Sequence, residues 1–180
     1  MTEESSEGGR RIDRITAPEF TRDLADLPLP DLRARRDECL AEREYLSLLR
    51  RLVQGRLDIL RAEADLRRRG EEPSALVDHV AEAMSNSAPP GTVRGEAVRL
   101  AVPPEDETRA HGHIEQLVGD ASISDPRSLS DDQLGTAIER LETEERAVSD
   151  DRRRVLDVHD VLQDELKRRF KENPAGALAP

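Results

Sequence analysis

The chain has 180 residues, enough for one domain, yet only 36% of them are hydrophobic and 2% aromatic, against 37% charged. Aromatic side chains supply much of the buried area of a globular core, so this composition predicts burial in a narrow seam between helices, as in a coiled coil. The formal net charge of −11 argues against a direct nucleic-acid partner, because phosphates require a basic face.

Residues 1–26 are expected to form an N-terminal tail. We expect residues 1–15 to be disordered and Ala17–Asp26 to form a short helix. The tail is polar and has no apolar stretch of the kind found in signal peptides, and no run in the chain reaches membrane-spanning length. The sequence therefore predicts a cytoplasmic protein.

The first long helix is predicted within residues 27–70. Pro28 and Pro30 precede it, Gly70 lies where a helix C-cap is expected, and Gly55 is the one glycine between them. A heptad spine runs through the segment, with Leu49 and Leu57 interleaved, and consists of Leu32, Cys39, Leu46, Val53 and Leu60. A helix of about 40 residues would be roughly 60 Å long at 1.5 Å per residue.

Residues 71–128 read as an acidic linker rich in Pro, Ser and Gly, much longer than a tight hairpin needs. Two short helices are predicted within it, over Ser74–Met84 and Glu107–Val118, and the rest is expected to be flexible. His111 and His113 fall in what reads as a flexible turn, and we interpret them as solvent-exposed side chains with no metal role.

The second long helix is predicted within residues 129–172, followed by a tail over 173–180. Ser130 is a good N-cap and is followed by acids in the first turn. The heptad spine, with Ile138 and Leu166 nearby, consists of Leu134, Leu141, Val148, Val155 and Leu162. The predicted fold class is all-α, a long antiparallel two-helix coiled coil with short accessory helices.

The two long segments align without a gap at an offset of 102 residues. Apolar matches prove little, because any two segments with the same heptad phase share them. Polar matches are more informative, because heptad phase does not produce them. Such matches include Glu42 with Glu144, Ser47 with Ser149, Arg50 with Arg152, Asp58 with Asp160, Glu63 with Glu165 and Arg67 with Arg169. A repeated polar face indicates a shared task or a duplicated ancestor.

A polar stripe recurs on both helices. Ser47, Arg50, Gln54 and Asp58 fall on one helix face, and Glu145, Ser149, Arg152 and Asp160 repeat it. Arginine binds phosphate or guanine through paired hydrogen bonds, and aspartate accepts from the N–H groups of guanine. A guanine nucleotide with several phosphates would satisfy both, and with few aromatic side chains its bases would stack on arginine planes or on a second ligand.

The stripe resembles the motif of the RsiG family of anti-sigma factors from spore-forming actinobacteria, written E-x3-S-x2-R-x3-Q-x3-D and present twice in one chain. In the first copy Arg43 occupies the Glu position and Glu44 lies one residue late. In the second copy Leu156 replaces Gln. The Arg and Asp positions match in both copies.

The resemblance implies a chain that binds a dimer of cyclic di-GMP and, once loaded, sequesters WhiG, a flagellar-type sigma factor that drives sporulation genes. It implies no enzymatic activity and a monomer before complex formation, since two stripes in one chain complete the site. The candidate ligand-binding residues are Glu44, Ser47, Arg50, Gln54, Asp58, Glu145, Ser149, Arg152 and Asp160. Without ligand, the stripe arginines are expected to repel one another.

A second hypothesis stays open. The same residues at the same spacing could form ordinary ion pairs on the solvated face of a coiled coil. The chain would then be a structural or adaptor coiled coil that acts on RNA polymerase without a small ligand.

Overall fold

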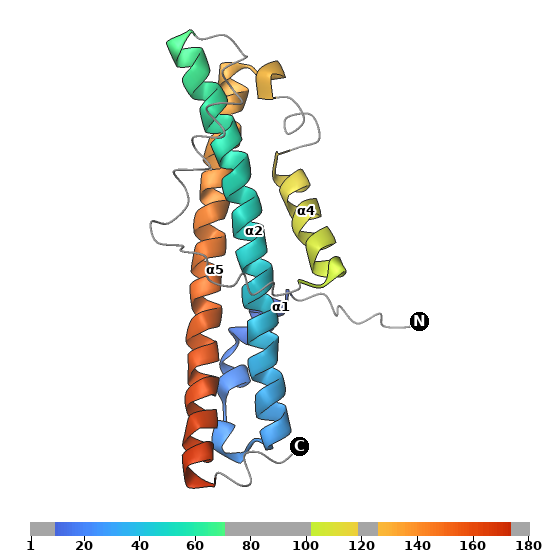
Figure 1. The fold of residues 1–180 in the computed structure, drawn as a ribbon, viewed down its shortest axis with the longest axis vertical. Coiled ribbons are helices and arrows are strands. Elements are labelled where there is room, and N and C mark those ends of the chain that lie inside the picture. The colour runs from blue at the N-terminus through green and yellow to red at the C-terminus, as the bar shows by residue number, and fades with distance from the viewer. Residues whose placement is uncertain (1–9, 71–101, 119–125, 174–180) are drawn as a thin grey trace, which may run out of the picture. The chain divides into compact units, whose positions relative to one another are not determined.

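A computed structural model describes residues 10–70, 102–118 and 126–173, and every regular element among them is helical (Figure 1). The predicted all-α fold class is confirmed. The elements, in chain order, are α1 (Arg11–Ile15), the short 3-10 helices η1 (Pro18–Thr21) and η2 (Leu24–Asp26), α2 (Leu29–Arg69), α4 (Pro104–Val118), η4 (Pro126–Ser128) and α5 (Asp131–Glu172).

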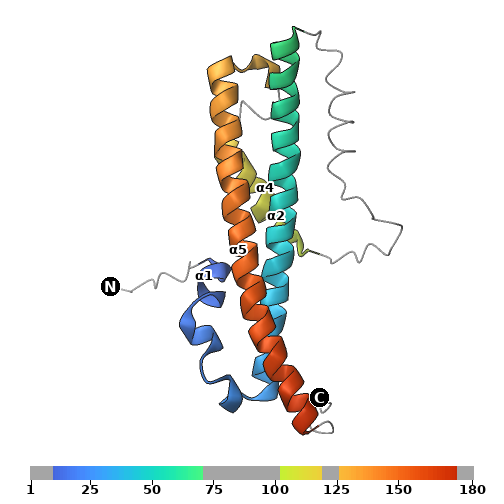
Figure 2. The ribbon, with the colours of Figure 1, turned by 90° about the vertical axis from the view of Figure 1, so that its left-hand side faces the viewer.

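The described residues belong to two compact units. Unit 1 contains residues up to Leu46 and from Asp150 onward, and unit 2 contains Ser47–Ser149. Each unit therefore combines one half of α2 with one half of α5. Within each unit the two halves lie side by side and run antiparallel, as Figures 1 and 2 show.

The ends of the two long helices follow from local chemistry. Gly70 ends α2 with a φ of 67°, the left-handed conformation that glycine adopts at little cost. At the start of α5 the Ser130 hydroxyl accepts from the Gln133 N–H at 3.2 Å, while the Gln133 side chain accepts from the Ser130 N–H at 2.9 Å. This reciprocal capping box confirms Ser130 as the N-cap.

The heptad spines form the apolar seam. All ten predicted spine residues are buried, as are the interleaved Leu49 and Leu57, while Ile138 and Leu166 are half-buried. Leu32, Leu141 and Leu162 are completely covered. The scarcity of aromatic residues thus matches a core made mainly of aliphatic side chains between paired helices.

Several shorter elements differ from the sequence predictions. Arg11–Ile15 form α1 instead of a disordered segment, because Ile12 and Ile15 are buried. In place of the short helix predicted at Ala17–Asp26, the chain forms two separate 3-10 helices, η1 and η2. The predicted helix at 107–118 is present as α4 and begins earlier, at Pro104, whereas the one predicted at Ser74–Met84 lies outside the described residues.

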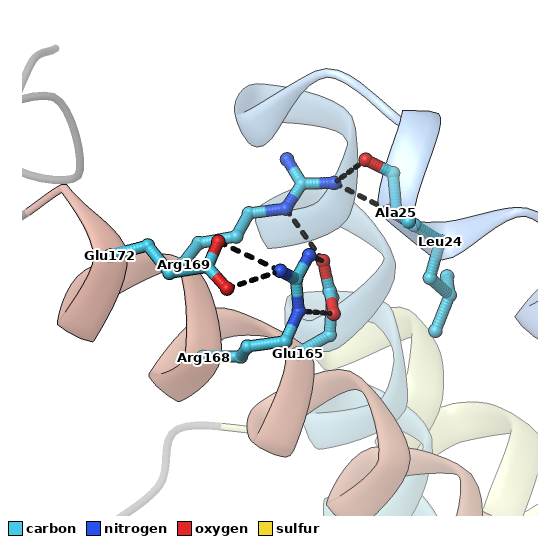
Figure 3. A network of polar contacts seen from close by, with 6 residues as sticks. All are labelled: Leu24, Ala25, Glu165, Arg168, Arg169 and Glu172. Carbon is cyan, nitrogen blue, oxygen red and sulfur yellow. Dashed lines mark hydrogen bonds and ion pairs between the residues drawn. The ribbon is translucent and has the colours of Figure 1, made fainter.

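The internal repeat also includes a contact in each unit, in which an arginine donates hydrogen bonds to the backbone carbonyls of a short 3-10 helix. In unit 2 an Arg67 terminal nitrogen donates to the carbonyls of Pro126 and Arg127, at 3.1 and 3.3 Å. In unit 1 its repeat partner Arg169 donates to the carbonyls of Leu24 and Ala25 (Figure 3). The accepting residues are themselves related by the offset of 102, so the repeat includes η2 and η4.

A second pair of contacts joins an accessory helix to a long helix in each unit. Arg11 of α1 is ion-paired with buried Glu42 in unit 1. His113 of α4 lies 2.7 Å from Glu144 in unit 2. His113 is the repeat partner of Arg11, and Ile114 of Ile12, and both isoleucines are buried. The repeat therefore covers the accessory helices as well as the long ones.

Glu165 is held as a carboxylate by its two arginine neighbours. Arg168 and Arg169 donate to it at 2.7 to 2.8 Å (Figure 3), and these bonds lower its pKa to about 2. A lowered folded-state pKa stabilises the fold above the unfolded pKa of about 4.3, and this stabilisation is lost as pH falls toward 2.

We therefore expect Glu165→Gln to reduce the unfolding free energy at pH 7 by about 1.5 kcal/mol, the lower end for hydrogen bonds to charged groups. The variant should also lose less stability than the parent between pH 4.5 and 2. Urea unfolding at several pH values measures both effects. The same change at exposed Glu139 controls for the loss of one negative charge. Parallel pH profiles for the parent and Glu165→Gln would contradict the expectation.

Cys39 lies in the α2 seam, completely covered. Burial, with the nearby charge of Glu38, raises the pKa of the Cys39 thiol to about 12. Because the thiolate is the reactive form, a maleimide should not label the folded chain at pH 8 and should label it in denaturant. Rapid labelling of the native chain, measured by mass spectrometry, would mean that the seam opens at Cys39.

None of the helices in the described ranges combines the length and apolar character needed to cross a bilayer.

Candidate functional site

The stripe residues in unit 2 converge on one carboxylate oxygen. Glu145 Oε1 accepts from Arg50 Nε at 2.8 Å, from Gln54 Nε2 at 3.3 Å and from Ser149 Oγ at 3.2 Å. Arg50 and Gln54 come from α2, whereas Glu145 and Ser149 lie one turn apart on α5. The structure therefore brings together four of the predicted site residues, from both stripes.

The donors around Glu145 are a guanidinium, an amide and a hydroxyl. These are the groups that proteins use to bind phosphate oxygens. The Arg50 side chain is 41% exposed and that of Glu145 23%, so the cluster is open to solvent on one side. In the described structure the Glu145 carboxylate accepts the hydrogen bonds of all three donors.

The pairing of Arg50 corrects one expectation. Repulsion between the stripe arginines was expected without ligand, but at Arg50 the Glu145 carboxylate neutralises the guanidinium. The sequence offset matches Arg50 with Arg152 and Glu145 with Arg43, so the equivalent positions in unit 1 are both arginines. The two copies of the stripe thus differ in charge at equivalent positions.

The other stripe residues of unit 2 flank the cluster on α2. Ser47 is half-buried, and its carbonyl accepts from Arg51 Nε at 3.3 Å. Asp58 is half-buried one turn beyond Gln54, and it makes no hydrogen bond or ion pair with any other residue in the described ranges. Its carboxylate is therefore available to accept hydrogen bonds from a ligand.

The remaining predicted residues lie in unit 1. Glu44 is ion-paired with its neighbour Arg43 at 2.7 Å. Arg152 is half-buried on α5, and Asp160 is exposed, with its carboxylate 3.2 Å from His159 Nδ1.

Sequence reasoning missed two contacts of α5 in unit 2. Arg61 donates to Glu142 at 2.7 Å, and His113 contacts Glu144 at 2.7 Å. The prediction that His111 and His113 lie in a flexible turn is wrong, since both are inside α4. The match of Glu144 to Glu42 in the repeat was a signal that this glutamate has a partner, but the partner was not identifiable without the accessory helix. No group of His, Cys, Asp and Glu arranged to hold a metal ion is present among the residues described.

The segment that contains the first copy of the stripe is similar to a known protein family. Residues 18–84 match the RsiG-like family. No curated protein matches the chain. The RsiG-like match confirms the resemblance drawn from the motif over these residues. It contains the whole first stripe, from Glu44 to Asp58, together with η1, η2 and α2. The second stripe lies beyond the matched range and is related to the RsiG-like segment through the internal repeat.

Proposed function

We propose that the chain is an anti-sigma factor whose polar stripes bind a dimer of cyclic di-GMP. Loaded with ligand, it sequesters a flagellar-type sigma factor of the WhiG kind and blocks transcription of sporulation genes. The chain acts as a monomer before it meets this partner, and it is not an enzyme.

The proposal rests on one observation above all. Arg50, Gln54 and Ser149 direct three different donors at a single oxygen of Glu145, within a chain whose first stripe lies in an RsiG-like segment. Arginine, amide and hydroxyl donors suit the phosphates of the ligand, and Asp58 suits the N–H edge of its guanine bases. Few aromatic side chains are present for stacking, so each guanine stacks mainly on another guanine.

Isothermal titration of the full chain with cyclic di-GMP tests the ligand. We expect saturation at two nucleotides per chain, weaker binding at higher salt, and no binding of cyclic di-AMP, whose adenine lacks the donors that Asp58 would accept. Saturation at one nucleotide would contradict the dimer.

A pull-down of a flagellar-type sigma factor, with and without cyclic di-GMP, tests the switch. Equal capture in both conditions would show that the sigma factor is bound without ligand control.

A second function is favoured by the same ion pair. Arg50 and Glu145 satisfy each other without any ligand, as residues on the solvated face of a plain coiled coil do. In that case the chain is an adaptor acting on RNA polymerase, and it should bind polymerase components while showing no heat of binding with cyclic di-GMP.

A further inference from the structure

An open groove lies in unit 1, between the first turns of α2 and the last turns of α5. Its apolar lining residues are Leu29, Leu166 and Phe170. Among the described residues, its lining also carries four cations and no acid, namely Arg33, Arg36, Lys167 and Lys171. None of these residues belongs to the polar stripes, so the groove is separate from the candidate ligand site.

The exposure of Phe170 is unusual for this chain. Only Phe20, Tyr45 and Phe170 are aromatic, and both Phe20 and Tyr45 are buried. Phe170 is 48% exposed, and exposed large apolar side chains set among polar residues mark binding surfaces. A protein with so few aromatic side chains thus leaves one of them exposed in the lining of a groove.

The charge of the lining is opposite to that of the chain. The net charge is −11, yet both lysines of the sequence, Lys167 and Lys171, line this groove. Arg36 is ion-paired with Asp37 at 2.6 Å and Lys167 with Asp164 at 2.9 Å. The Asp37 and Asp164 side chains are 60% and 75% exposed, so water screens these pairs and an incoming carboxylate can replace them at little cost.

The shape of the groove fits a helix. Gln163, Leu166, Lys167, Phe170 and Lys171 recur at helical spacing along one face of α5, and Leu29, Arg33 and Arg36 do so along α2. A third helix can pack its apolar side chains between two such ridges.

We propose that this groove is a docking site for an acidic amphipathic helix of a protein partner. The apolar face of that helix covers Leu29, Leu166 and Phe170, and its Asp and Glu side chains pair with the cations of the lining. The proposal does not depend on cyclic di-GMP, because no residue of the groove belongs to the stripes.

The test uses the full chain and a fluorescein-labelled synthetic helical peptide with leucines on one face and glutamates on its flanks. Fluorescence anisotropy should show binding that weakens with salt, and a twin peptide with lysines in place of glutamates should not bind. Phe170→Ala should weaken binding about tenfold or more, as for an aromatic anchor at an interface. The double change Lys167→Glu and Lys171→Glu should do the same.

Val161→Ala is the matched control, because Val161 is 50% exposed on the same helix and does not line the groove. It should bind the peptide as the parent does, and circular dichroism should show equal helical content in every variant. Failure of the acidic peptide to bind, or equal weakening by Val161→Ala, would overturn the proposal. Phe170-dependent binding to anionic phosphatidylserine vesicles without peptide binding would assign the groove to a membrane instead. Phe170-dependent self-association without peptide binding would assign it to a second copy of the chain.

Discussion

Replacing Arg152 or Asp58 by alanine is expected to weaken cyclic di-GMP binding by one to two powers of ten. A charged hydrogen-bonded contact contributes about 1.5–3 kcal/mol, which corresponds to this loss of affinity. Asp58 makes no ion pair within the described ranges, so its removal takes nothing from the fold. Both residues lie beside the spine and alanine is a better helix former than either, so stability should change by less than about 1 kcal/mol.

The repeat supplies matched controls for this experiment. Arg51 and Arg153 are neighbours of the stripe arginines, are related by the same offset and are both exposed. Alanine at Arg153 removes the same charge without contacting the stripe, and alanine at Arg51 removes it together with one hydrogen bond to the Ser47 backbone carbonyl, leaving every stripe side chain in place. Both should leave the dissociation constant within about twofold, the effect expected of a screened surface charge. Calorimetry gives the affinity, and circular dichroism gives helical content and melting temperature. Normal binding by Arg152→Ala and Asp58→Ala would show that the stripe is only the solvated face of a coiled coil and does not bind the ligand.

The largest loss of stability is expected from Leu162→Ala. Leu162 is completely covered in the seam of unit 1, and its truncation removes buried area and leaves a cavity between α2 and α5. Substitutions of this kind cost about 2–5 kcal/mol. Urea unfolding followed by circular dichroism measures the change. Leu60→Ala, at the repeat-equivalent position in unit 2 and 3% exposed, should cost a similar amount.

The adjacent residue serves as the control for this prediction. Val161 precedes Leu162 on α5, and its side chain is 50% exposed. Val161→Ala should change the unfolding free energy by less than about 0.5 kcal/mol, as surface substitutions do. Equal losses for Val161→Ala and Leu162→Ala would show that the seam does not carry the stability of the coiled coil.

The long helices were predictable because their signals are local and repeated. A seven-residue period fixed the buried face of α2 and α5, and the cap residues Gly70 and Ser130 fixed where one ends and the other begins. Short elements were less predictable. α1 has only five residues, and its buried Ile12 and Ile15 are meaningful only once the long helix that covers them is in place.

For the candidate site, the sequence predicted which residues share a helix face but not which partners they meet. The spacing of Ser47, Arg50 and Gln54 needs only helix geometry. The contact of Arg50 and Gln54 with Glu145 depends on how the two helices are registered against each other, and heptad positions alone allow several registers. The same limit hid the contact between His113 and Glu144, which requires the position of α4.

Each unit is built from one part of α2 and one part of α5, which are far apart in the sequence, and this determines when the protein can fold. The hydrogen bond from Arg169 to Leu24 joins residues that are 145 positions apart in the sequence, and the Arg50–Glu145 pair joins residues 95 apart. Arg11 and Glu42, by contrast, are 31 apart. Contacts between distant residues carry a large loop-closure entropy and form slowly. On the ribosome, unit 1 cannot be completed until the segment from Asp150 has emerged. Until then the spine residues of α2 in unit 1, Leu32, Cys39 and Leu46, lack the helix that covers them, and the nascent chain is open to chaperones, proteases and aggregation.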